Sequence, residues 1–148
     1  WQGRMERIHP NVVLDGAHNL DAIERFTESL SRLYGSREIS LLFAVAGDKD
    51  YRPMIDALCE SLNLSKVYVT SLNSKRGIKA EHIADIFKEY LGIHHKMNNC
   101  VVVYDDSIKD IFTQAYEAVK NTDETLFCVG SLYLIGSIKE MAKEVLND

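Results

Sequence analysis

The chain alternates between short, continuously apolar runs and longer segments in which apolar residues recur every three or four positions. Five runs are rich in β-branched and aromatic residues, and we expect strands at residues 11–14, 40–45, 66–70, 100–104 and 125–129. Runs without polar alternation predict strands that are buried on both faces, as in a parallel sheet covered by helices.

Helical periodicity follows each of these runs. We expect apolar helix stripes at residues 23–33, 54–62, 83–91, 108–119 and 134–145. Gly35 and Gly92 are expected to end the first and third helices, and Pro53 to lie in the first turn of the second. The pattern predicts a three-layer α/β fold, Rossmann-like, with a doubly wound, mainly parallel sheet and helices on both faces.

Two polar or weakly patterned segments are less clear. Residues 4–8 alternate weakly, which fits either an additional edge strand or the end of an interdomain linker. Residues 94–99 form a polar loop, and we expect it to be a more flexible surface than the other polar loop, at residues 73–79.

Composition limits the class of protein. With 148 residues, of which 46% are hydrophobic, the chain can bury one ordinary core, and we expect one domain over residues 1–148. The net charge of −5 disfavours generic nucleic-acid binding, and no apolar run is long enough for a membrane span. Three cysteines without zinc-ligand spacing indicate reduced thiols and a cytoplasmic protein: Cys59, Cys100 and Cys128. The start at Trp1, without Met or a signal peptide, predicts a piece of a longer protein.

Candidate chemistry lies in the loops that follow the expected strands, because doubly wound sheets bind ligands at the carboxyl ends of their strands. In the first of these loops, Asp15 can accept hydrogen bonds from ribose hydroxyls. His18 can bind a carboxylate or take a proton from an amine, and Asn19 suits a helix N-cap. The alternative is that Asp15 and Asn19 only satisfy backbone donors and that His18 is a solvated loop residue.

The ends of two further strands carry side chains that could bind an anion. Lys49 lies between Asp48 and Asp50 and can supply a point charge to a phosphate; alternatively, the segment is a solvated turn in which Asp50 caps a helix. Ser131 offers a hydroxyl at a helix start, which suits a carboxylate or phosphate, or else it is a plain cap.

No metal site is expected from the sequence. We expect one of Asp105 and Asp106 to be a surface acid and the other to lie in a turn, and we do not expect them to bind a metal as a pair. His94 and His95 are adjacent, so they lack the spacing of metal ligands on a helix. Residues 71–76 form another polar strand-end loop. Glycine-rich dinucleotide and Walker-type phosphate loops are absent from the sequence, so we expect no phosphate loop of those types.

Four motifs occur together at successive strand ends: GRME at residues 3–6, VLDGAHN at 13–19, DKDY at 48–51 and VGSLYL at 129–134. In this order they resemble the C-terminal domain of folylpolyglutamate synthase/dihydrofolate synthase, a relative of the Mur ligases. The resemblance covers essentially the whole chain.

The resemblance implies an ATP-dependent ligase that adds L-glutamate to the γ-carboxyl of folates through an acyl phosphate. By the same resemblance, Arg4 and Asp15 would bind ATP, His18 and Ser131 would bind the incoming glutamate, and Asp15 and His18 would be the catalytic residues. Lys49 lies in a family motif without an assigned role.

The resemblance also implies what this chain lacks. ATP and Mg²⁺ would be the cofactors, but the Walker-type loop, the Mg²⁺ ligands and most of the folate site would belong to a larger N-terminal ATPase domain. We therefore expect the isolated chain to fold without catalysing ligation. Two departures from the family pattern, Gln2 and Leu20 where proline is frequent, touch no expected ligand contact.

Three alternatives remain open from the sequence. A peptidoglycan-precursor ligase of the Mur type would share the same domain. A receiver-like regulatory domain would need an acidic pair after the first strand, where this chain has Asp15 alone, and a lysine after the fifth, where it has Ser131. A pure interaction module on the same scaffold would bind neither nucleotide nor glutamate.

Overall fold

The computed structural model describes residues 3–73 and 77–146. Trp1 and Gln2, and residues 74–76 of the predicted strand-end loop, lie outside the described residues. Six strands form one sheet: β1 (Glu6–His9), β2 (Val12–Asp15), β3 (Ile39–Phe43), β4 (Leu64–Val69), β5 (Val101–Tyr104) and β6 (Leu126–Val129). The helices are α1 (Leu20–Tyr34), α2 (Tyr51–Ser61), α3 (Ala80–Ile93), α4 (Ile108–Val119) and α5 (Leu132–Val145), with a 3₁₀ turn η1 (Met97–Asn99).

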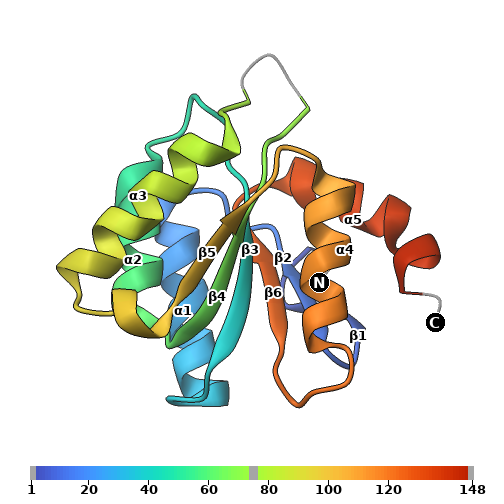
Figure 1. Ribbon diagram of the computed structural model, residues 1–148, viewed down its shortest axis with the longest axis horizontal. Coiled ribbons are helices and arrows are strands. Elements are labelled where there is room, and N and C mark those ends of the chain that lie inside the picture. Colours follow the sequence, from blue (N-terminus) through green and yellow to red (C-terminus); the bar gives the residue numbers. More distant parts are fainter. Residues whose placement is uncertain (1–2, 74–76, 147–148) are drawn as a thin grey trace.

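The sheet lies between two helical layers, with α1, α2 and α3 on one face and α4 and α5 on the other (Figure 1). Its strand order is β1-β2-β6-β3-β4-β5, and all neighbouring pairs are parallel except β1 with β2. The predicted α/β fold is confirmed, and β1 shows that the weakly alternating segment contains an edge strand.

The last strand, β6, lies between β2 and β3. The chain leaves β2 and β3 toward α1 and α2 on one face of the sheet, but it leaves β6 toward α5 on the other face (Figure 1). Connections that part in this way open a crevice at the carboxyl ends of the strands, which is where such sheets bind ligands.

The strands in the centre of the sheet are buried as predicted, but the edge strand β5 is not. Every residue of β2, β3 and β6 is buried. In β6, Phe127 packs toward α1–α3 and Cys128 toward α4 and α5, so both faces of this strand are covered. The prediction is wrong for β5, where Val101 is 56% exposed. This strand has a neighbour on one side only, and the helices cover it in part.

Helix ends were predicted in part. Asn19 caps α1 by accepting a hydrogen bond from the Ala22 N–H (2.8 Å), and Gly35 ends that helix with a φ of 60°. Gly92 does not end α3, which continues to Ile93. The left-handed residue that follows is His95, with a φ of 58°.

The polar segment 94–99 is not the loosely held loop that the sequence predicted. It contains η1, and the Lys96 ammonium donates to three carbonyl oxygens at the end of α2, those of Cys59 (2.7 Å), Glu60 (2.8 Å) and Leu62 (3.2 Å). A cation at a helix C-terminus satisfies carbonyls that have no partner within the helix, so this segment is fixed to α2.

The three cysteines are buried and unpaired, as predicted. Burial raises the pKa of the Cys59 thiol to about 12 and that of Cys100 to about 11. Among the described residues, no helix combines the length and the apolar character needed to cross a membrane.

Candidate functional site

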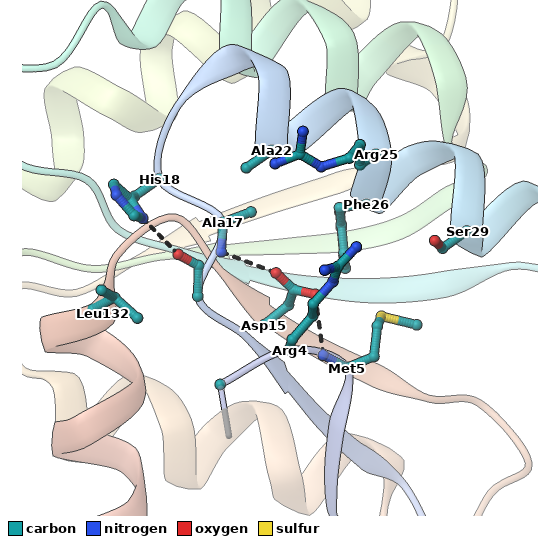
Figure 2. A pocket seen from close by; sticks show the side chains of 12 residues that line it. Arg4, Met5, Asp15, Ala17, His18, Ala22, Arg25, Phe26, Ser29 and Leu132 are labelled. Carbon is teal, nitrogen blue, oxygen red and sulfur yellow. Dashed lines mark hydrogen bonds between the residues drawn. The ribbon is translucent and has the colours of Figure 1, made fainter. Parts of the chain in front are cut away.

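Two hollows at the carboxyl edge of the sheet are lined by the predicted site residues. The first, the arm hollow, lies between residues 3–5 (the arm), the loop after β2, and Arg25, Phe26 and Ser29 of α1 (Figure 2). The second, the loop hollow, lies where the loops after β2, β3 and β6 meet. His18 and Leu132 line both hollows, which are therefore adjacent.

Asp15 ends β2 and ties the arm to the sheet. Its side chain is buried, and its two oxygens accept hydrogen bonds from the Ala17 N–H (2.9 Å) and the Met5 N–H (3.1 Å). Burial raises the pKa of this carboxyl, against the opposing effect of the two amides and of the Arg4 charge. The alternative in which Asp15 satisfies backbone donors is confirmed, and the same carboxylate also lines the arm hollow.

The arm is held in place by a bonded turn. The Gly16 N–H donates to the Gly3 carbonyl, and the Gly3 N–H donates to the Glu6 carboxylate (2.8 Å). Glu6 also pairs with Lys139 of α5 (2.8 Å), so the arm is joined to both β2 and α5.

Arg4 stands at the tip of this arm. Figure 2 shows its side chain extending into the arm hollow toward α1. Within residues 3–73 and 77–146, its guanidinium has no hydrogen-bond or ion-pair partner. The charge is therefore available to an anion in the hollow.

His18 stands between the two hollows with one ring nitrogen occupied. Its Nδ1 lies 2.8 Å from the Gly16 carbonyl oxygen (Figure 2). A carbonyl can only accept, so Nδ1 carries the proton, and Nε2 of the neutral ring is left as a proton acceptor. The ring is half-buried, so it is fixed in orientation and still reachable.

The loop hollow depends on a close approach of backbones at Gly130. This residue has a φ of 119°, and a Cβ built on it would lie 2.2 Å from the Ala44 carbonyl oxygen. Its N–H donates to the Ala17 carbonyl (3.0 Å), which joins the loops after β2 and β6. Only glycine fits both the dihedral angle and the space.

Ser131 and Lys49 face the same loop hollow as His18. The Ser131 Oγ accepts from the N–H groups of Tyr133 (3.0 Å) and Leu134 (3.4 Å), so the predicted cap of α5 is confirmed. Those bonds use only its lone pairs, and its O–H proton remains able to donate. Lys49 is exposed, and in the described part of the chain its ammonium forms no ion pair.

Asp50 does not cap α2, although it occupies the N-cap position. A capping side chain bonds the N–H of the second or third helical residue, and here the third residue is Pro53, which has no N–H.

The remaining strand-end acids lie outside both hollows. The Asp106 carboxylate accepts from the Ser71 hydroxyl (2.6 Å) and from the Ala80 N–H at the start of α3 (2.8 Å). Asp105 accepts from the Ser107 N–H (2.8 Å). Both acids are thus bonded in turns, as the sequence predicted.

Sequence reasoning did not assign a ligand contact to several residues that line the hollows. Arg25 and Phe26 come from α1, beyond the strand-end loops that were searched. Leu132 lies in a strand-end loop that the sequence did single out, but its role was not predicted; it is 60% exposed and lines both hollows.

The family model described as "Mur ligase, glutamate ligase domain" matches residues 3–132. The chain belongs to this family. The dihydrofolate synthase/folylpolyglutamate synthase of Bacillus subtilis is 32% identical over 145 residues, which are 97% of this chain and 31% of that relative. A UDP-N-acetylmuramoyl-L-alanyl-D-glutamate–2,6-diaminopimelate ligase of Pseudomonas aeruginosa is 38% identical, but over 60% of this chain and 19% of that relative.

Solved structures agree on the fold of this Mur ligase domain. Escherichia coli FolC in complex with DHPP and ADP has a TM-score of 0.77 at 23% identity, covering 97% of this chain and 32% of that one. A bifunctional folylpolyglutamate synthase/dihydrofolate synthase from Yersinia pestis, complexed with AMPPNP and Mn, has a TM-score of 0.73 at 20% identity, covering 97% and 31%. The chain spans about a third of the length of these relatives.

Proposed function

We propose that this Mur ligase domain is the C-terminal domain of a folylpolyglutamate synthase/dihydrofolate synthase, an ATP-dependent ligase that adds L-glutamate to the γ-carboxyl of folates. The observation that carries the proposal is the convergence of three strand-end loops on the loop hollow, where His18, Lys49 and Ser131 keep polar atoms free. Similarity to the Bacillus subtilis enzyme over 97% of the chain supports it.

The reaction has two steps. The folate carboxylate attacks the γ-phosphate of ATP, which releases ADP and leaves an acyl phosphate. The glutamate amine then attacks the acyl carbon, forming the amide and expelling phosphate. Positioning and charge stabilisation of the transferring phosphoryl group dominate chemistry of this kind.

The arm hollow would contact ATP. The free guanidinium of Arg4 suits a phosphate, and Asp15 suits ribose hydroxyls, because each of its oxygens keeps a lone pair beyond the one used by a backbone N–H. The same carboxylate is a poor Mg²⁺ ligand, since both oxygens accept from amides and Arg4 lies nearby. As the family resemblance implies, Mg²⁺ that neutralises the phosphates would be held by a larger N-terminal domain.

The loop hollow would take the incoming glutamate. Lys49 and the Ser131 hydroxyl suit a carboxylate, the first as a charge and the second as a donor. Nε2 of His18 would accept a proton from the amine, which must be neutral to attack, so His18 is the candidate general base. Asp15, which holds the arm and the loop around His18, is the second residue on which catalysis would depend.

The peptidoglycan-precursor ligase and the receiver domain fit these observations less well. Similarity to the peptidoglycan-precursor ligase covers 60% of the chain, against 97% for the folate enzyme. A receiver domain needs an accessible phosphate-accepting aspartate, whereas Asp15 is buried and bonded by two amides.

The test is His18→Ala in the full-length enzyme, with kcat and KM measured separately for glutamate and for ATP. We expect kcat/KM for glutamate to fall about tenfold or more while the ATP KM changes less than about twofold, because His18 is assigned to the amine whereas Arg4 and Asp15 are assigned to ATP. His95→Ala, which removes an exposed imidazole outside both hollows, is the matched control.

A second experiment tests whether this chain is one domain of a larger enzyme. The 148-residue chain alone should release no phosphate with ATP, glutamate and folate, while the full-length enzyme should turn over. Turnover by the isolated chain would contradict the division of the site between two domains, and an unchanged kcat/KM for glutamate in His18→Ala would contradict the role of His18.

A further inference from the structure

A second group of ligating side chains lies at the opposite edge of the sheet. Asp56 and Glu60 are one helical turn apart on α2, and His94 is the first residue after α3, which packs beside α2 on the same face (Figure 1). One oxygen of each carboxylate and one ring nitrogen lie within 4.8 Å of one another. The shortest of these contacts joins His94 Nε2 to Asp56 Oδ1 (2.6 Å).

We propose that Asp56, Glu60 and His94 form a binding site for one first-row transition-metal ion of the Zn²⁺ class, bridging α2 and the end of α3. One imidazole nitrogen with two carboxylate oxygens is a mixed donor set that Zn²⁺ binds well, with water in the fourth position. Ligand atoms about 2.0–2.2 Å from one ion lie roughly 3.3–3.6 Å apart, so small side-chain rotations suffice.

The backbone around the group is already fixed. The His94 N–H donates to the Tyr90 carbonyl (3.0 Å), and Lys96 joins the segment after α3 to the last carbonyls of α2. Ligands that are held in place before the ion arrives lose less conformational entropy on binding.

The charges also favour a cation. Two carboxylates face a single imidazole, and in the described part of the chain the Glu60 carboxylate has no hydrogen-bond or ion-pair partner. The nearby ammonium of Lys96 bonds backbone carbonyls and not these carboxylates, so it leaves them free. On coordination, the His94 proton that faces Asp56 would be lost from Nε2, and the neutral ring would carry its proton on Nδ1.

This site differs from the sequence expectation, which considered His94 with its neighbour His95 and found no metal spacing. The structure instead pairs His94 with residues more than thirty positions earlier in the chain. The group is separate from both hollows at the carboxyl edge and shares no lining residue with them.

The test is titration of the untagged chain with Zn²⁺ by calorimetry, with Co²⁺ absorption as a report on the ligands. His94→Asn and His95→Asn form a matched pair, because each removes one imidazole and only the first belongs to the group. Glu60→Gln is a second variant that breaks no bond present in the structure. Mg²⁺, which prefers all-oxygen ligands, is the control ion.

We expect one Zn²⁺ per chain, with an affinity that falls about tenfold or more in His94→Asn and in Glu60→Gln and stays unchanged in His95→Asn. We also expect Zn²⁺ to raise the Tm of the wild type and not that of His94→Asn. Absence of saturable binding, or equal affinity in all variants, would overturn the proposal.

Discussion

At the amino edge of the sheet, buried polar side chains bond one another. Ser40 is fully buried, and its hydroxyl donates to the Glu124 carboxylate, which also accepts from the Ser65 hydroxyl (2.8 Å). Asn11 donates to the carbonyls of Thr122 (2.9 Å) and Glu124 (2.8 Å). At the carboxyl edge, by contrast, the bonds of His18 and Ser131 are to the backbone and leave Nε2 and a hydroxyl proton free.

This comparison distinguishes polar groups that stabilise the fold from polar groups that are able to bind a ligand. A buried polar atom costs free energy unless it has a partner, and at the amino edge the buried Ser40 and Asn11 side chains are bonded within the protein. The carboxyl edge keeps free polar atoms because it opens into two hollows, where water or a ligand supplies the missing partner. The carboxyl-edge side chains that keep atoms without protein partners, His18 and Ser131, are therefore the candidates for ligand binding.

The largest effect should come from Gly130→Ala, which tests whether the carboxyl edge also depends on backbone packing. A Cβ only 2.2 Å from the Ala44 oxygen, at a φ of 119°, should lower the free energy of unfolding by about 3 kcal/mol or more. Gly136→Ala is the control, because a Cβ there meets nothing within 4 Å and helix propensity should add about 0.5–1 kcal/mol. Urea unfolding measures both; similar values for the two would disprove the packing argument.

The next effect concerns the amino edge. Ser40→Ala removes a donor from the Glu124 carboxylate and should cost about 1–3 kcal/mol in unfolding free energy, with no change in the glutamate KM of the full-length enzyme. Ser36→Ala, at an exposed serine, should stay within about 0.5 kcal/mol of the wild type. A raised glutamate KM in Ser40→Ala would show that the two edges are not separate.

The smallest effect on stability is expected for alanine substitutions of two serines that cap helices. Ser131 caps α5 and Ser107 caps α4, so replacing either by alanine should cost about 1 kcal/mol. Only Ser131 faces the loop hollow, and only Ser131→Ala should raise the glutamate KM. Equal KM values for the two variants would reduce Ser131 to a helix cap.

Most of the fold was predictable because each element carries its own pattern. The apolar runs locate the five parallel strands, and Asn19 and Ser107 mark two helix starts through bonds that are local in sequence. The wrong predictions concern residues whose surroundings depend on other parts of the chain. Whether Val101 is buried depends on which strand lies at the edge of the sheet, and the proline three residues after Asp50 removes one of the two N–H groups that this side chain could have capped.

The candidate site was predictable to the extent that it lies at strand ends. Asp15, His18, Lys49 and Ser131 all came from that rule, and the structure places each of them on one of the two hollows. The part contributed by α1 and the group around His94 could not be predicted, since both depend on how elements distant in sequence pack together.

The position of β6 determines the order in which the domain can be completed during synthesis. Without β6, the sheet consists of two separate parts, the pair β1–β2 and the three strands β3–β4–β5, because β2 bonds only β1 and β6. A ribosome must therefore translate residue 129 before β1 and β2, the second of which carries Asp15, join the rest of the sheet. Chains that stop earlier would expose two unpaired strand edges, so incomplete products should be prone to aggregation and proteolysis.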